Sequence, residues 1–427
     1  MIPPLALVFV AAQANVVTLE EALKTARERQ PQLMQAHANT GAAEARAGEA
    51  RAGLLPQVNG TAAYERTTSN FVAHPGFVPG GASFNTTQSL TTYNFFNFGL
   101  NAQQLLWDFG LTLDTWRAAK KTALSQEETE RATRLLVELN ARSAYFNARA
   151  QKELVVVAQD NLGNQRKHLT QVEGFVAVGT HPEIDLAQSR TDVANAKVQL
   201  INAENAYESA KATLNQAMGV EGPTDYDVAA ETLPPLEGED LATDRLLVEA
   251  VQHRPELASL ERQIEAAALT VHAQRGAYFP SFSTGMAVTA ASTDITDLGW
   301  NGNLSLSMTW GIFQGLLTRE TVREARYKLT AADAARDLER QQIRLEVDQA
   351  RLAVRAAKEA ISAADEALFN AKERLRLAEG RYQTGVGNII ELGDAQLALT
   401  QAAAQKVQAD FNLATARAQL LKALGRS

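Results

Sequence analysis

The sequence predicts a mostly α-helical protein with a smaller β portion, built from two copies of a helix, a hairpin, a long helix and a second helix. Three observations carry this prediction: an internal duplication, segments in which apolar and polar residues alternate, and a long apolar heptad repeat. With 427 residues, 45% hydrophobic and 21% charged, the chain can bury a sizeable core. Collagen-like and wholly disordered proteins are therefore excluded.

The N-terminus resembles an export signal. The apolar run Ile2–Ala14 ends in a small-residue cleavage pattern, so we predict that residues 1–14 are a signal peptide. No Lys or Arg precedes Lys24, so we expect its basic n-region to be incomplete; the alternative is an apolar N-terminus of a cytosolic protein. No later run approaches the roughly 20 apolar residues of a membrane helix, so any membrane crossing must use strands.

Two sets of residues recur along the chain. The matching positions are Leu23, Pro31 and Pro56 with Leu247, Pro255 and Pro280, and Gly179 and Gly219 with Gly385 and Gly425. The first set recurs after 224 residues and the second after 206. We therefore divide the chain into a first repeat at 15–218, a linker at 219–243 and a second repeat at 244–427. The extra residues of the first half fall in the Gly/Pro-rich stretch 71–84, which predicts a long loop.

Each repeat starts with a helical segment and continues into strands. In the segment 18–53, Pro31 predicts a break in the helix. The segments 281–290 and 303–310 alternate with period two, which is typical of strands. One face of the second segment is apolar and is predicted to face lipid; it consists of Leu304, Leu306, Met308 and Trp310. The first-half strands, 57–68 and 90–106, alternate less regularly but carry aromatic residues suited to a membrane interface.

The long helix of the second half is predicted over 318–383. From Ile343 to Tyr382, apolar residues follow in steps of four and three, and large residues alternate with alanine over more than five heptads. A helix of about 65 residues is ~95 Å long, at 1.5 Å per residue. A single globular core cannot enclose such a rod, so we expect closely packed helices in a cylinder. The final helix of the first half is predicted over 182–218.

Four strands per chain cannot close a barrel alone, because small barrels need about eight. Bacterial barrels use even numbers of strands, so two chains would give eight and three would give twelve. The alternative is a soluble sheet lying on a helix, in a non-channel coiled-coil scaffold protein of the periplasm or cell surface.

Several motifs resemble the TolC-like family of outer-membrane efflux proteins. They are TLEEALKTARERQPQL at 18–33 followed by LLPQV at 54–58, their counterparts ELASL at 256–260 and YFPSF at 278–282, and the two turns that follow Gly179 and Gly385. The resemblance extends from Thr18 to Arg426. It implies a homotrimer with a 12-stranded transmembrane β-barrel in the outer membrane, continued by a periplasmic α-helical barrel.

The resemblance also implies a function and partners. The chain would be the outer-membrane channel subunit of a tripartite efflux pump or type I secretion system, a passive exit duct for small molecules or polypeptide. Its partners would be two further copies, outer-membrane lipid, a periplasmic adaptor (membrane fusion) protein and an inner-membrane transporter.

Catalytic and cofactor motifs are absent from the sequence. The six histidines lack metal-ligand spacing, and we interpret each as a surface or interface residue. The chain has no cysteine, no phosphate-binding loop and no nucleophile elbow. The net charge is −8, without blocks of like charge. We therefore predict that the protein is not an enzyme and has no cofactor, metal site or nucleic-acid partner.

A candidate gate follows the turn that begins at Gly385. Glu391 and Asp394 are three residues apart and share a helix face, and the counterpart turn holds Asp185. The resemblance implies that these acids lie at the periplasmic entrance and that Tyr382 helps to lock the helices shut, whereas Gly387 stands where the family has a locking arginine. The turn glycines are Gly179, Gly385 and Gly387, and unusual φ angles are expected at Gly385 and Gly387. The alternative is ordinary acids near a helix N-terminus.

Overall fold

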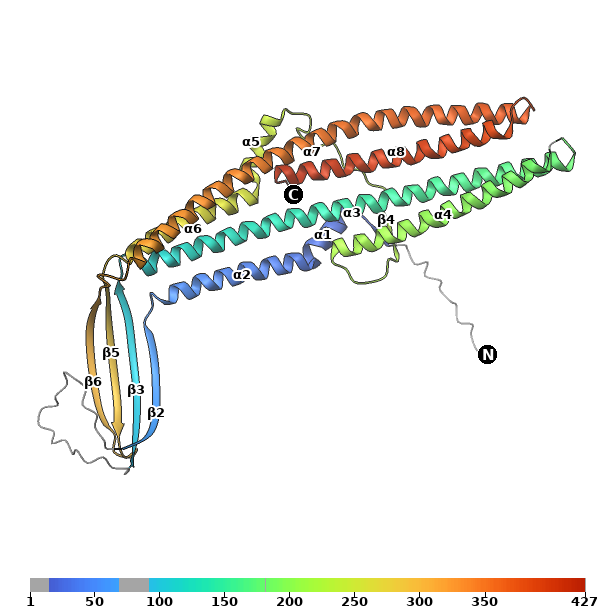
Figure 1. Ribbon diagram of the computed structural model, residues 1–427. Helices are drawn as coiled ribbons and strands as arrows, with labels where there is room; N and C mark the ends of the chain where they lie inside the picture. The colour runs from blue at the N-terminus through green and yellow to red at the C-terminus, as the bar shows by residue number, and fades with distance from the viewer. Residues whose placement is uncertain (1–14, 69–91, 181, 427) are drawn as a thin grey trace, which may run out of the picture. The chain divides into compact units, whose positions relative to one another are not determined.

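The computed structural model describes residues 15–68, 92–180 and 182–426 (Figure 1). Over these ranges the chain forms eight helices and six strands, so the predicted mostly α-helical protein with a smaller β portion is confirmed. The predicted signal peptide at 1–14 and the predicted loop at 71–84 lie outside the described residues.

The helices of the two halves match in order and length. They are α1 (Leu19–Arg29), α2 (Pro31–Ala52), α3 (Leu111–Ala177) and α4 (Glu183–Met218), then α5 (Thr243–His253), α6 (Pro255–Gly276), α7 (Leu317–Gln383) and α8 (Ile389–Leu424). In each half the four helices have 11, 22, 67 and 36 residues. The predicted break at Pro31 is confirmed, because α1 ends at Arg29 and α2 begins with the proline.

The chain divides into two compact units, and each unit combines segments of both halves. The helical unit contains the described residues up to Thr40, together with 126–259 and 336–426. The sheet unit contains 41–125 and 260–335, apart from the undescribed residues 69–91. No helix in the described part of the chain is long and apolar enough to cross a membrane.

The sheet unit holds one four-stranded antiparallel sheet (Figure 1). Its strands are β2 (Gln57–Thr68), β3 (Thr92–Trp107), β5 (Ser281–Ser292) and β6 (Gly299–Thr309), in the order β2-β3-β5-β6. The register aligns apolar residues across the strands: Val58 lies opposite Ala102, which lies opposite Met286, which lies opposite Leu304. Because side chains alternate between faces, the sheet has one mainly apolar and one mainly polar face, with β2 and β6 at its edges.

The heptad repeat of α7 is the buried seam of that helix. Most of its positions from Ile343 to Tyr382 are buried, and Ile361 and Leu368 are half-buried. The N-terminal part of the seam, from Ile343 to Val354, packs against α5 and α8 in one hydrophobic cluster, in which Leu246 and Leu420 are fully buried. Alanine at alternate seam positions lets neighbouring helices approach closely.

The C-terminal ends of α4 and α8 each contact the break between two earlier helices. The end of α4 contacts the break between α1 and α2, and the end of α8 contacts the break between α5 and α6. Gly219 and Gly425 adopt left-handed conformations, with φ of 70° and 73°. At the first site the side chain of Gln30 donates hydrogen bonds to carbonyl oxygens in the last turn of α4, at 3.0 and 3.1 Å. At the second site Arg254 donates to the carbonyl of Lys422 at 3.3 Å. The residue before each proline therefore caps a neighbouring helix.

The segment between the halves contains structure that the sequence did not predict. Its strand β4 (Tyr226–Val228) pairs in parallel with β1 (Asn15–Val17). The carboxylate of Asp227 accepts hydrogen bonds from Lys152 at 2.6 Å and from Tyr207 at 2.7 Å. These contacts attach the segment to α3 and α4.

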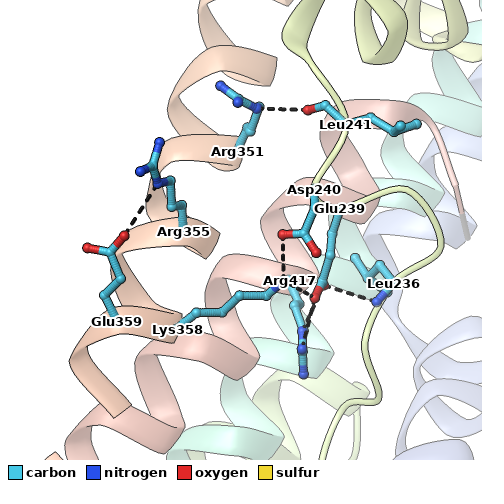
Figure 2. Close-up of polar contacts among 9 residues, drawn as sticks. All are labelled: Leu236, Glu239, Asp240, Leu241, Arg351, Arg355, Lys358, Glu359 and Arg417. Atoms are coloured by element: carbon cyan, nitrogen blue, oxygen red, sulfur yellow. Dashed lines mark hydrogen bonds and ion pairs between the residues drawn. The ribbon is translucent and has the colours of Figure 1, made fainter. Parts of the chain in front are cut away.

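Further along, an ionic clasp fastens the same segment to α7 and α8 (Figure 2). Glu239, only 5% exposed, accepts hydrogen bonds from Arg417 at 2.9 and 3.0 Å, and Lys358 lies 2.7 Å from both Glu239 and Asp240. Burial alone would raise the pKa of Glu239, but the hydrogen bonds from Arg417 and Lys358 outweigh it and lower the pKa to about 2. Arg351 adds a hydrogen bond to the carbonyl of Leu241 at 2.9 Å.

Candidate functional site

The candidate gate is built on the two helix-to-helix turns of the helical unit. Gly179 ends α3 with φ of 79°, and Gly385 ends α7 with φ of 74°. The N–H group of Gly179 donates to the carbonyl of Val176 at 2.9 Å, and that of Gly385 donates to the carbonyl of Tyr382 at 3.1 Å. The two turns therefore have the same C-terminal helix cap, as expected where only glycine adopts the left-handed conformation without strain.

Gly387 has a different role, and the expectation of an unusual φ angle is wrong for this residue. Its N–H group donates to the carbonyl of Arg381 at 2.9 Å. A Cβ atom here would lie 3.1 Å from the backbone nitrogen of Tyr382, so glycine allows the chain to pass close to the end of α7. This turn therefore requires glycine at 387 because there is no room for a side chain, and not because the backbone needs a left-handed conformation.

Tyr382 is a core residue of the region next to the turns. It is 2% exposed and lies in a cluster with Val172, Leu375 and Leu392, which joins α3, α7 and α8. Burial raises the pKa of its phenol, and the negative charge of Asp185 raises it further. Its position makes it a packing residue of the helix ends; its role in a gate stays a prediction.

His168 corrects the interpretation of all six histidines as surface or interface residues. It is 5% exposed and its ring lies 5.2 Å from that of Tyr382. Its burial could have been predicted from its neighbours, because His168, Val172 and Phe175 are spaced at helical intervals and share one face of α3. That spacing was the signal in the sequence.

The two predicted gate acids lie in different surroundings. The carboxylate of Glu391 is 3.2 Å from Nε of Arg381, so its charge is paired within the chain. Asp394, one turn further along α8, is exposed. At the start of this helix the side chain of Asn388 accepts a hydrogen bond from the N–H group of Glu391 at 2.8 Å, whereas its counterpart Pro182 makes no such cap on α4.

A groove of about 720 Å³ with a mixed polar and apolar lining brings together two of the predicted residues, Asp185 and Asp394. It lies between α3, α4 and α8, and Glu391 and Tyr382 do not line it. Its walls also carry Gln188, the first-half counterpart of Asp394, and Asp192, which the sequence did not single out. Asp192 follows Asp185 after one heptad, so helical spacing could have identified it.

The second candidate surface is the apolar face of the sheet. Along β6 and just beyond it, Leu304, Leu306, Met308 and Trp310 are 80%, 74%, 60% and 51% exposed. Residues of the other strands continue the same face; among them are Val58, Leu100, Phe98 and Met286. The opposite face carries side chains such as Asn59, Asn101, Asn303 and Ser305. A soluble protein seldom exposes so continuous an apolar surface unless it is an interface.

Comparison with known proteins identifies the family. The sequence profile of the outer membrane efflux protein family matches residues 22–220 and 246–426, which is most of the chain. The chain belongs to this family. The predicted resemblance is confirmed, and the chain is a subunit of an outer-membrane efflux channel, located in the outer membrane with a periplasmic extension.

Relatives of this efflux protein agree in sequence and fold. The pyoverdine export outer membrane protein OpmQ of Pseudomonas putida is 25% identical over 422 residues, covering 95% of this chain and 85% of that protein. The cation efflux system protein CusC of Escherichia coli is 25% identical over 221 residues, about half of each chain. The outer membrane channel CmeC of Campylobacter jejuni has the same fold, with a TM-score of 0.82 at 21% identity over 95% of this chain and 85% of that chain. By their names, these relatives are an export protein, an efflux protein and a channel.

Proposed function

We propose that three copies of this chain form one exit duct, with a 12-stranded barrel in the outer membrane and a helical barrel in the periplasm. The open four-stranded sheet carries the proposal, because it has an apolar face and two free edges. Such edges are stable in a bilayer only when each pairs with another strand. The sheet therefore needs further copies to complete it.

The direction of the edge strands suits closure by identical copies. Each neighbouring pair in the order β2-β3-β5-β6 is antiparallel, so β2 and β6 run in opposite directions. When β6 of one copy pairs with β2 of the next, the whole ring stays antiparallel, as in bacterial barrels. Three copies of the four-stranded sheet give 3 × 4 = 12 strands, which leave room for a pore, whereas a barrel of about eight strands leaves a filled interior.

In this proposal the polar face of the sheet lines the pore and Leu304, Leu306, Met308 and Trp310 contact lipid. The helix ends with Tyr382, Asp185, Glu391 and Asp394 form the periplasmic gate. A periplasmic adaptor protein and an inner-membrane transporter would complete the pump, and the transporter would select the cargo. The names of the relatives mention pyoverdine and cations, so they do not point to a single cargo.

Crosslinking between the sheet edges tests the assembly. Because the chain has no cysteine, Thr61→Cys on β2 can be combined in turn with Asn301→Cys, Asn303→Cys or Ser305→Cys on β6 without competing thiols. We expect oxidation in membranes to give a ladder that ends at the trimer for at least one pair. The control pairs Thr61→Cys with Thr289→Cys on the inner strand β5 and should remain monomeric. A ladder that ends at the dimer, or a soluble monomer without detergent, would overturn the trimeric duct.

A further inference from the structure

A basic groove of about 770 Å³ lies in the sheet unit where α6 ends and α7 begins. It is open to solvent and combines arginines with aromatic side chains. Its charged and aromatic lining consists of Arg275, Arg319, Arg323, Arg326, Tyr278, Phe279 and Tyr327. Neither the gate nor the apolar sheet face accounts for this cluster.

The groove carries an excess of positive charge. Among the described residues, Arg275 and Arg326 have no acidic partner within ion-pair distance. Arg319 and Arg323 share a single acid, Glu320, at 3.7 and 3.4 Å. Four guanidinium groups therefore face one carboxylate, and an anionic ligand would balance them.

The groove begins where the apolar face of the sheet ends. The ring of Phe279 stacks on Phe109 at 4.8 Å, and Phe109 in turn meets Trp107 at 6.0 Å. Trp107 lies opposite Phe282 on the apolar face of the sheet. Just beyond the end of β6, the indole of Trp310 donates to the carbonyl of Tyr278 at 3.2 Å. An aromatic belt thus connects the apolar surface to the arginines.

We propose that this groove binds the phosphodiester headgroup of an anionic phospholipid in the periplasmic leaflet of the outer membrane. The inference rests on the proposed function, because it requires the apolar face of the sheet to contact the hydrocarbon of the bilayer. Aromatic side chains then occupy the interface and the arginines reach the headgroups, where planar guanidinium groups bind phosphate in a bidentate manner. The acyl chains lie along the side of Phe279 and Trp310.

The exposed aromatic side chains of the groove favour a lipid ligand over an acidic segment of a partner protein. Tyr278, Phe279 and Tyr327 are 47%, 54% and 64% exposed and surround the arginines. A lipid satisfies both parts of this surface at once, because its headgroup is charged and its chains are apolar. An acidic peptide would satisfy only the arginines.

Native mass spectrometry of the purified full chain in mild detergent tests the site. Phosphatidylglycerol is added to the wild type, to the groove variant Arg275→Gln/Arg326→Gln, and to the charge-matched control Arg166→Gln/Arg374→Gln, whose residues are exposed in the helical unit. We expect the groove variant to bind phosphatidylglycerol roughly 25-fold more weakly, because each of the two basic residues near an anionic surface contributes on the order of fivefold. The control should bind like the wild type, and zwitterionic phosphatidylcholine should not distinguish the three proteins.

Equal retention of phosphatidylglycerol by the wild type and the groove variant would overturn the lipid site. Displacement of the lipid by excess inorganic phosphate would also overturn it, because the groove would then be a general anion site. Insertion into planar bilayers separates this inference from the proposed function. If the proteins insert and conduct but bind lipid equally, only the lipid site fails; if the wild type does not insert at all, both proposals fail.

Discussion

The imidazole ring of His168 meets the phenol ring of Tyr382 edge to face, with centroids 5.2 Å apart and planes at 66°. The pair joins α3 to α7, and neither side chain is more than 5% exposed. Burial lowers the pKa of His168 below its ordinary 6.5, although the charges of Asp192 and Asp185 and a hydrogen bond with Gln171 oppose the shift. The packed helix ends therefore favour the neutral imidazole.

Acid should loosen this contact. Below pH 6.5 the imidazole of His168 takes up a proton when the helix ends are locally unfolded, but not when they are packed, because the pKa is lower in the packed state. The packed state therefore loses stability as the pH falls, by up to about 1.4 kcal/mol per pH unit, until the pH reaches the folded pKa. We expect hydrogen exchange around residues 168 and 382, corrected for intrinsic rates, to accelerate between pH 7.5 and pH 5. The variant His168→Gln should lose this acceleration. An unchanged pH response in the variant would assign it to another group.

The clasp at Glu239 has its own pH dependence. Its folded pKa of about 2 lies below the ordinary 4.5, so its contribution of roughly 3 kcal/mol is present above pH 4.5 and disappears as the pH falls toward 2. We expect Arg417→Gln to destabilise the clasp by about 2–3 kcal/mol, because a buried carboxylate loses its bidentate partner and keeps only Lys358 and the backbone N–H group of Leu236. Hydrogen exchange of residues 236–241 measures the loss.

Arg355→Gln is the matched control for this clasp variant. Arg355 pairs with Glu359 at 3.4 Å on the same helix as Lys358, but both side chains are more than 70% exposed (Figure 2). An exposed pair of this kind contributes at most about 0.5 kcal/mol. Similar losses in the two variants would mean that burial does not determine the strength of the clasp.

Two glycines with nearly the same backbone conformation should respond differently to alanine. Gly179 has φ of 79° and open space around the position of a Cβ atom, so Gly179→Ala should cost only the backbone strain of about 1–2 kcal/mol. At Gly219, with φ of 70°, a Cβ atom would lie 2.7 Å from the carbonyl oxygen of Arg29. We expect Gly219→Ala to lose at least about twice as much stability in thermal unfolding. Equal losses would show that the contact relaxes freely.

The two faces of β6 should tolerate charge unequally. Leu306 lies on the apolar face opposite Thr284, and its neighbour Ser307 lies on the polar face opposite Ser283. Leu306→Arg should impair assembly in the membrane, because an arginine facing lipid costs roughly 2–4 kcal/mol at mid-bilayer. Ser307→Arg should assemble and change the conductance. Equal recovery of heat-modifiable oligomer from both variants would contradict the assigned faces.

The sequence was sufficient wherever local rules determine the structure. The predicted strand 57–68 coincides with β2, and the helix predicted over 182–218 corresponds to α4, because proline and glycine define these boundaries. The seam from Ile343 to Tyr382 was recognisable for the same reason.

Contacts between distant parts of the chain could not be predicted. The pairing of β1 with β4 joins Val16 to Asp227, and strands of three residues are too short to show a period. The hydrogen bonds of Glu239 to Arg417 span 178 residues of sequence. Likewise, helical spacing grouped Glu391 with Asp394 but did not reveal that Arg381, across the turn, pairs with only one of them.

This asymmetry between the acids gives a prediction for the gate. In the proposed trimer, Asp394 would contribute three charges near the axis, and it has no ion-pair partner among the described residues. The charge of Glu391 is already balanced by Arg381. We expect Asp394→Asn to lower the ratio of cation to anion permeability by at least about twofold, because it removes net negative potential from the entrance.

Glu391→Gln/Arg381→Gln removes the pair without changing the net charge and should leave the ratio close to that of the wild type. Reversal potentials of single channels in planar bilayers under a salt gradient measure both effects, and block by a trivalent cation should weaken only in Asp394→Asn. If Asp394→Asn changes neither selectivity nor block, this residue is an ordinary helix-terminus acid and its place in the gate is wrong.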